Sequence, residues 1–181
     1  MSALFDRLSQ YLEALSEWVG KAVAWLTLAM VLGTVVVLVF RYLFNEGAIA
    51  LQESVLYLHA MVFMLGAAYT LKDNEHVRVD VFYRKFSPRQ QAWVNIIGYL
   101  TLLLPVTIFI MVTSWKFVAF SWRILEGSNE PGGLAIVYLL KSLLLVMPAL
   151  LLAQGLAQTL RLLLFLAGKG KNPLPEAEQH V

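Results

Sequence analysis

Residues 22–40 read AVAWLTLAMVLGTVVVLVF, a run of 19 residues without a single charge. A helix needs about 20 apolar residues to cross a hydrocarbon core about 30 Å thick. Three further charge-free runs follow, at residues 54–71, 90–115 and 142–160. Backbone groups in lipid must be satisfied within their own segment, so runs of this length indicate helices and not barrel strands. We therefore predict four transmembrane helices, over approximately residues 19–43, 49–72, 88–122 and 134–162.

The composition supports this interpretation. Of the 181 residues, 59% are hydrophobic and 14% are charged, whereas soluble domains are usually about 45–50% apolar and about 25% charged. The surplus apolar surface must face lipid, which predicts an all-α integral membrane protein. We expect a single four-helix membrane domain over residues 1–166, followed by a polar cytoplasmic tail over residues 167–181.

Charge and cysteine content exclude several classes of function. The net charge is only +2 and the basic residues are scattered along the chain, so nucleic acid is not an expected partner. The chain has no cysteine, which excludes disulfides, thiolate metal sites, iron–sulfur clusters and thiol catalysis. No cofactor is predicted.

The distribution of Lys and Arg predicts the orientation. Ten of the 14 basic residues lie in the N-terminal segment, the link between the second and third spans, and the tail, and four lie on the other side. Because basic residues accumulate on the cytoplasmic side, both termini should be cytoplasmic. The first span follows three acidic residues and is longer than the apolar region of a signal peptide, so we expect it to remain in the mature protein.

The segment before the first span has an amphipathic pattern. Apolar residues recur at helical spacing over residues 4–18, with acidic and other polar residues between them. This pattern predicts an N-terminal amphipathic helix that lies in the membrane interface. A plain cytoplasmic lead-in to the first span is the alternative.

The third span begins at SPRQ, residues 87–90. Ser87 is suited to the N-cap position, Pro88 to the first helical position and Gln90 to the reciprocal bond of a capping box. From Pro88 to Leu125 only Pro105 interrupts the helical pattern, and 38 residues would extend about 57 Å. The helix must therefore tilt, protrude from the bilayer or kink at Pro105.

Polar residues within the spans are candidates for function because lipid cannot satisfy them. His59 is the only ionisable residue deep in a charge-free run. It lacks the second histidine that a membrane haem would need, so a histidine that packs between helices is the simpler interpretation. Arg41, Glu53 and Lys141 lie near the outer ends of spans one, two and four. Their side chains either reach the headgroups or pair with one another.

The fourth span carries a stripe of small and amide residues. Its members are Ala149, Ala153, Gln154, Ala157 and Gln158. Small residues at every fourth position let two helices approach closely, and the glutamines can then hydrogen-bond across the contact. The stripe is typical of a packing surface more than of a substrate site.

The link between spans two and three contains HVRVDVF at residues 76–82. Its strict alternation resembles a strand, but no second strand exists to pair with it, so we favour a short interfacial helix or an extended connector. If the segment is helical, His76 and Asp80 lie one turn apart and can form an ion pair. A metal site or proton relay would need further ligands that this link lacks.

Five features of the chain carry a family resemblance. They are FRYLFN at residues 40–45, Glu53 at the start of the second span, LGAA at residues 65–68, HVRVD at residues 76–80 and EGSNEPGGL at residues 126–134. Together with the length and the four-span plan, they resemble the small membrane subunit, the DctQ-like or Q subunit, of tripartite ATP-independent periplasmic (TRAP) transporters. Family members often have a tryptophan and a double acid where this chain has LQES at residues 51–54. That departure limits the role expected of Glu53 to a structural one.

The resemblance implies a subunit of a bacterial inner-membrane complex. In such complexes a periplasmic substrate-binding protein captures a small organic acid and docks on the outer face, and a large membrane subunit moves the acid inward with sodium. The small subunit packs against the large one and enlarges its fixed scaffold, surrounded by membrane lipid. The candidate structural and subunit-interface residues are then Arg41, Glu53, His76, Arg78, Asp80, Lys141, Ala149, Ala153, Gln154, Ala157 and Gln158.

The residues by themselves contain no recognisable transport or enzyme site. Secondary transporters usually bind sodium and carboxylates where helices are interrupted near the midplane, but only Pro105 and Pro148 interrupt these spans, without an adjacent acid. A self-sufficient small four-span transporter or exporter is the alternative function, and it should carry an acid in its first span, which residues 22–40 lack. A cytochrome subunit or a membrane enzyme would need paired histidines or a nucleophile–base pair within the spans.

Overall fold

The computed structural model describes residues 2–73, 83 and 85–169, and within these ranges all regular structure is helical. The elements are α1 (Ser2–Leu43), α2 (Ile49–Lys72), α4 (Pro88–Gly98), the π-helical segment η1 (Tyr99–Leu103), α5 (Leu104–Ile124) and α6 (Val137–Leu166). Four helical stretches in this part of the chain are long and apolar enough to cross a membrane: Ser9–Leu43, Ile49–Lys72, Pro88–Ile124 and Val137–Leu166. The predicted all-α fold with four spans is confirmed.

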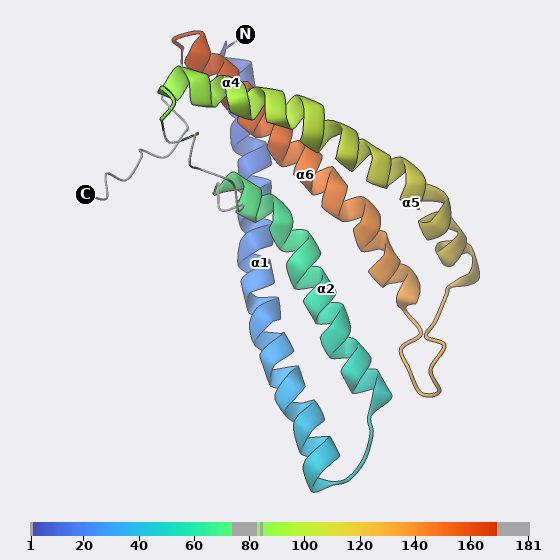
Figure 1. Ribbon diagram of the computed structural model, residues 1–181. Coiled ribbons are helices and arrows are strands. Elements are labelled where there is room, and N and C mark those ends of the chain that lie inside the picture. Colours follow the sequence, from blue (N-terminus) through green and yellow to red (C-terminus); the bar gives the residue numbers. More distant parts are fainter. Residues whose placement is uncertain (1, 74–82, 84, 170–181) are drawn as a thin grey trace.

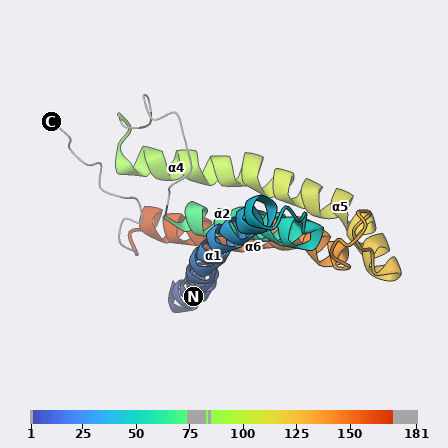
Figure 2. The ribbon, with the colours of Figure 1, turned by 90° about the horizontal axis from the view of Figure 1, so that it is seen from below.

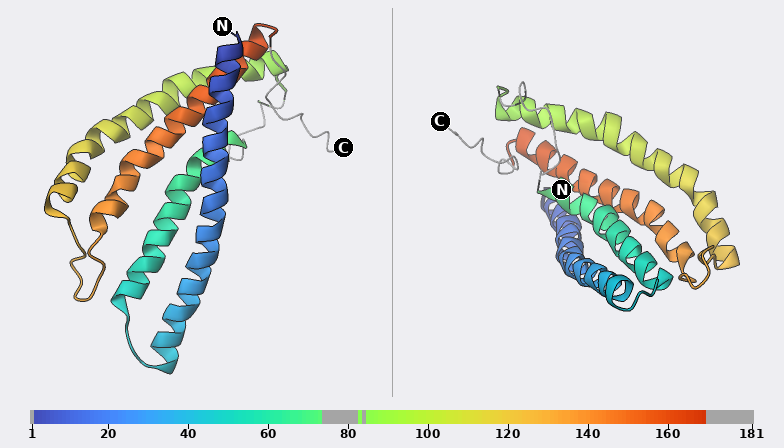
Figure 3. Two further views of the ribbon diagram at one scale, coloured as in Figure 1. Left: turned by 180° about the vertical axis from the view of Figure 1, so that it is seen from behind. Right: turned by 60° about the horizontal axis from the view of Figure 1, so that its bottom comes forward.

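The four stretches form two antiparallel hairpins, α1 with α2 and α4–η1–α5 with α6 (Figure 1). Helix α6 contacts α1, α2, α4 and α5, and so joins the two hairpins. Figures 2 and 3 show α4, η1 and α5 as one long, gently curved rod beside α6. Large apolar side chains such as Trp25, Phe63 and Val112 are exposed on the outside of the bundle, as expected for surfaces that face lipid.

One cluster of buried apolar side chains lies where α4 meets α6. Ala92, Ile96 and Leu162 form its centre, and Tyr99 and Phe165 pack against them. Small residues let these helices approach closely. A Cβ atom placed on Gly155 of α6 would lie 2.4 Å from Cδ2 of Leu103 in η1, so no larger residue fits there without a shift of that leucine.

The N-terminal amphipathic segment differs from our expectation of a separate interfacial helix. Helix α1 runs unbroken from Ser2 to Leu43, and its 42 residues extend about 63 Å. Its polar face is turned inward, since Ser9, Glu13 and Ser16 are buried, while Tyr11 and Trp18 are 75% and 71% exposed. The segment continues into span one because its polar residues find partners on α2 and α6 instead of in water.

The third span begins with the predicted capping box, and it accommodates Pro105 through a π-helical turn that the sequence did not indicate. The Ser87 side chain accepts a bond from the Gln90 N–H and the Gln90 side chain accepts one from the Ser87 N–H, which completes the capping box before Pro88. Pro105 has no N–H to donate to a preceding carbonyl. The π-helical turn η1 lies directly before it, where the Leu104 N–H bonds to the Tyr99 carbonyl, so a wider turn accommodates the proline and the helix continues.

Candidate functional site

The polar side chains of the bundle gather in two places, one where α1, α2 and α6 meet and one around the loop between α5 and α6. Neither resembles a metal centre, since no group of three or more His, Asp or Glu among the described residues could hold a metal ion. We call the first group the three-helix polar cluster. Its members are Glu13, Ser16, Glu17, Lys72, Gln154, Gln158 and Arg161.

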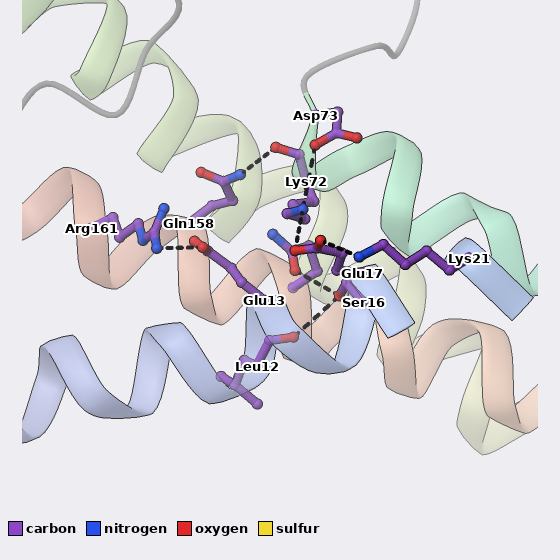
Figure 4. Close-up of polar contacts among 10 residues, drawn as sticks. Leu12, Glu13, Ser16, Glu17, Lys21, Lys72, Asp73, Gln158 and Arg161 are labelled. Carbon is purple, nitrogen blue, oxygen red and sulfur yellow. Dashed lines mark hydrogen bonds and ion pairs between the residues drawn. The ribbon is translucent and has the colours of Figure 1, made fainter. Parts of the chain in front are cut away.

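The three-helix polar cluster is held by charge and by hydrogen bonds between helices (Figure 4). Glu13 on α1 pairs with Arg161 on α6, and the Ser16 hydroxyl donates to the Gln154 side-chain oxygen at 2.7 Å. On the α2 side, the Lys72 ammonium lies 3.3 Å from Glu17. These contacts fix residues 13–17 of α1 against residues 154–161 of α6 and the last turn of α2.

Two stripes of identical spacing produce this contact, and of their members only Gln154 and Gln158 were predicted from sequence. Buried polar residues of α1 follow one another at intervals of four and three in the stripe Ser9, Glu13 and Ser16. The polar residues of α6 do so in the stripe Gln154, Gln158 and Arg161. Matched polar stripes on two helices are a signal that could have identified Glu13 and Arg161 from sequence.

The alanines of the predicted packing stripe are not equally covered. Ala157 is fully buried, Ala153 is half-buried and Ala149 is exposed. The glutamines of the stripe lie in the polar cluster, where Gln154 is fully buried and the Gln158 amide donates to the Lys72 carbonyl at 3.0 Å. Within this chain the stripe therefore packs at its Ala157 end, and its Ala149 end is left open.

Glu53 binds the α5–α6 loop, residues 125–136, across from α2. One carboxylate oxygen accepts the Leu134 N–H at 2.6 Å and the other accepts the Ser128 hydroxyl. Gly133 lies against this contact, because a Cβ atom there would be 2.8 Å from Glu53 and 2.5 Å from the Ser128 hydroxyl oxygen. Glu53 thus has a partner in the loop and not in Arg41 or Lys141.

Lys141 pairs within its own hairpin. Its ammonium lies 2.5 Å from the Glu126 carboxylate and 4.0 Å from the centre of the Phe117 ring. The hydrogen bond from Lys141 holds the pKa of Glu126 below its usual value near 4.5. Beside this pair the Trp122 indole donates to Ser142 at 2.8 Å. These contacts fix the end of α5 to the start of α6.

The remaining candidates lie apart from both groups. Arg41 is exposed in the last turn of α1 and has no ion pair with any described residue. His59 is exposed on α2, which contradicts the interpretation that it packs between helices of this chain. His76, Arg78 and Asp80 lie outside the described residues.

An apolar groove of about 690 Å³ separates α4–η1–α5 from α2 and α6. Tyr83 and Asn95 supply polar atoms at its wall, and the Asn95 amide donates to the Tyr83 hydroxyl at 2.9 Å. None of the described residues that line it carries a charge. In this part of the chain the groove therefore offers no cationic side chain to a carboxylate.

Comparisons with known proteins converge on one family. The model of the family of tripartite ATP-independent periplasmic transporters, DctQ component, matches residues 30–165. A curated relative, the C4-dicarboxylate TRAP transporter small permease protein DctQ of Vibrio cholerae serotype O1, is 25% identical over 113 residues, which are 62% of this chain and 47% of that protein. The match thus spans about half the length of the relative. No solved structure is significantly similar to the chain.

Proposed function

This chain belongs to the family of DctQ components of tripartite ATP-independent periplasmic transporters, and on that premise we propose that it is the small scaffold subunit that packs against a large transport subunit. It is a multi-pass protein of the bacterial inner membrane, with four helices that can span it. As a transport component of this kind it is not an enzyme.

The observation that carries the proposal is that four acidic side chains near the ends of the spans all have partners within this chain. Glu13 pairs with Arg161, Glu17 with Lys72, Glu126 with Lys141, and Glu53 with loop donors. A sodium or carboxylate site needs groups that are free for the substrate, usually at the ends of interrupted helices. The described helices offer a π-turn before Pro105 and an internal proline at Pro148, with no charged side chain among the residues that line the adjoining groove.

We further propose that the complete transporter takes up a small organic acid with sodium and depends on a periplasmic binding protein. The relative in Vibrio cholerae is named for C4-dicarboxylates, which supports an organic acid as the substrate class. In this proposal the large subunit and the binding protein select the acid, and the present chain supplies fixed surface for the large subunit.

Reconstitution tests the scaffold proposal. Liposomes that hold only the purified chain should show no sodium-driven uptake of radiolabelled succinate or malate. Liposomes that also hold the large subunit, with the binding protein added outside, should take up an acid when an inward sodium gradient is applied. Uptake by the chain alone would establish a self-sufficient transporter, and uptake by the large subunit and binding protein without the chain would show that no scaffold subunit is required.

A further inference from the structure

His59 is a polar side chain exposed on a helix that can span the membrane. It lies ten residues into α2, which begins at Ile49, and therefore about 15 Å along a helix that spans about 36 Å. His59 therefore lies near the middle of α2, a helix long and apolar enough to cross the bilayer. The side chain is exposed on the outside of the bundle, and it makes no hydrogen bond to another described residue.

Other polar groups of the spans behave differently. The exposed hydroxyls of Thr34 and Thr113 donate to carbonyls one turn earlier on their own helix, at 2.8 Å and 2.7 Å, so they can face lipid. The imidazole of His59 has no such bond within the described residues. A ring nitrogen that faces hydrocarbon without a hydrogen-bond partner is energetically costly. The imidazole of His59 therefore requires a hydrogen-bond partner that lipid tails cannot supply.

His59 belongs to a continuous exposed stripe on α2. The α2 stripe consists of Gln52, Leu56, His59 and Phe63, at intervals of four, three and four residues, and all four side chains are exposed. This spacing is that of the contact line between two helices packed side by side. At its outer end the stripe borders a groove of about 370 Å³, which Glu130 of the α5–α6 loop also lines.

We propose that the α2 stripe receives a transmembrane helix of the large subunit, which gives His59 a hydrogen-bond partner near the middle of α2. This inference rests on the proposed scaffold function and identifies α2 as the helix that contacts the large subunit. A second copy of this chain fits the stripe poorly, because symmetric pairing would bring two Glu130 carboxylates together at the rim, where like charges repel. A different chain can instead present a polar side chain to His59 and a cation to Glu130.

Co-purification measures the contact. The chain is co-expressed with the tagged large subunit, and the ratio of chain to large subunit is determined after purification in mild detergent. His59→Leu should lower this ratio about fivefold, although leucine suits lipid better than histidine does, while His59→Gln should stay within twofold of wild type because its amide can hydrogen-bond. The matched control is Thr34→Val, which also removes an exposed polar group from a span and should leave the ratio unchanged.

The outcomes separate this inference from the function on which it rests. If the wild-type chain does not recover the large subunit, the scaffold function itself fails. If it does and His59→Leu matches wild type, or His59→Gln falls as far as His59→Leu, the hydrogen bond at His59 is refuted.

A cross-link identifies the occupant independently of complex stability. The chain contains no cysteine, so Phe63→Cys can carry a benzophenone maleimide at a single position in native membranes. An adduct that contains the tagged large subunit supports the proposal. An adduct of two copies of the chain, or labelled lipid without a protein adduct, overturns it.

Discussion

Gly133 shows how closely the α5–α6 loop folds onto Glu53. A Cβ atom at this position would lie 2.6 Å from the Ser128 Cβ and 2.8 Å from a Glu53 oxygen, both far inside ordinary contact distance. Gly133→Ala should therefore displace the loop and lower stability by roughly 1–3 kcal/mol, the usual cost of overpacking. Thermal unfolding of the purified chain in detergent checks this expectation.

The control for Gly133 is the other interhelical turn. A methyl group added at Gly47 would have no other atom within 4 Å, and this glycine does not need a positive φ angle. Gly47→Ala should leave the melting temperature within about a degree of wild type, because it adds no clash. Equal melting temperatures for the two variants would show that the loop is not held against α2 by this contact.

The Glu126–Lys141 pair predicts a pH dependence with a definite sign. Because the hydrogen bond from Lys141 lowers the pKa of Glu126 below its usual value near 4.5, the ionised carboxylate favours the folded state. This contribution is complete above pH 4.5 and is lost as the pH falls through the lower pKa of the folded state. The melting temperature of wild type should exceed that of Glu126→Gln at pH 7, and the difference should shrink as the pH falls below 4.5. A difference that is constant across this range would mean that ionisation of Glu126 does not stabilise the fold.

At the scale of elements, local signals were readable from sequence, whereas the direction in which each helix face points was not. The capping box at Ser87 and Gln90 depends on four consecutive residues, so the sequence predicts it directly. The orientation of the N-terminal part of α1 depends on Arg161 and Gln154, which are distant in sequence. Periodicity identifies the polar face of a helix but does not show whether that face meets water or another helix. The π-turn at η1 was missed for a similar reason, since a proline predicts a disturbed helix without specifying which form it takes.

The pairing of Glu13 with Arg161 makes an element-scale prediction. Glu13 is 8% exposed, whereas the Arg161 side chain is 38% exposed, so removal of the arginine should cost roughly 1–3 kcal/mol, less than for a fully buried pair. Arg161→Leu should lower the melting temperature, and addition of Glu13→Gln should restore part of the loss because it removes the unpaired carboxylate.

The exposed pair on the same helix supplies the control for that experiment. Lys21 contacts Glu17 at 2.8 Å, but its side chain is 73% exposed, and exposed pairs contribute little. Lys21→Ala should hardly change the melting temperature. If the double variant Glu13→Gln/Arg161→Leu is less stable than Arg161→Leu alone, the carboxylate of Glu13 must have another stabilising partner.

For the whole molecule, the sequence predicts four spans and their order because each is long and apolar enough to be recognised alone. The apolar runs do not show which spans contact one another. Helix α6 joins both hairpins, and although the alanine stripe predicted a packing surface at Ala157, the sequence did not indicate its partners or the contact of Gly155 with Leu103. In the candidate site, too, the sequence identified residues but not their partners. Glu53 and Lys141 were recognised as polar residues near span ends, but their partners lie in a loop whose fold depends on Gly133.

The orientation of the whole bundle is the last prediction, and it combines sequence charge with the observed fold. The structure places the α5–α6 loop and the turn between α1 and α2 toward one end of the bundle, and the start of α4 and the end of α6 toward the other (Figure 1). The second end holds Lys72, Lys85, Arg89 and Arg161, so it should remain in the cytoplasm, where basic residues accumulate. Because the chain has no cysteine, Asn129→Cys and Lys169→Cys each give a single label site, and both positions are exposed. In intact cells a membrane-impermeant maleimide should label Asn129→Cys but label Lys169→Cys only after the membrane is permeabilised. Labelling of Lys169→Cys in intact cells together with protection of Asn129→Cys would invert the bundle and place the loop held by Glu53 in the cytoplasm, away from any periplasmic binding protein.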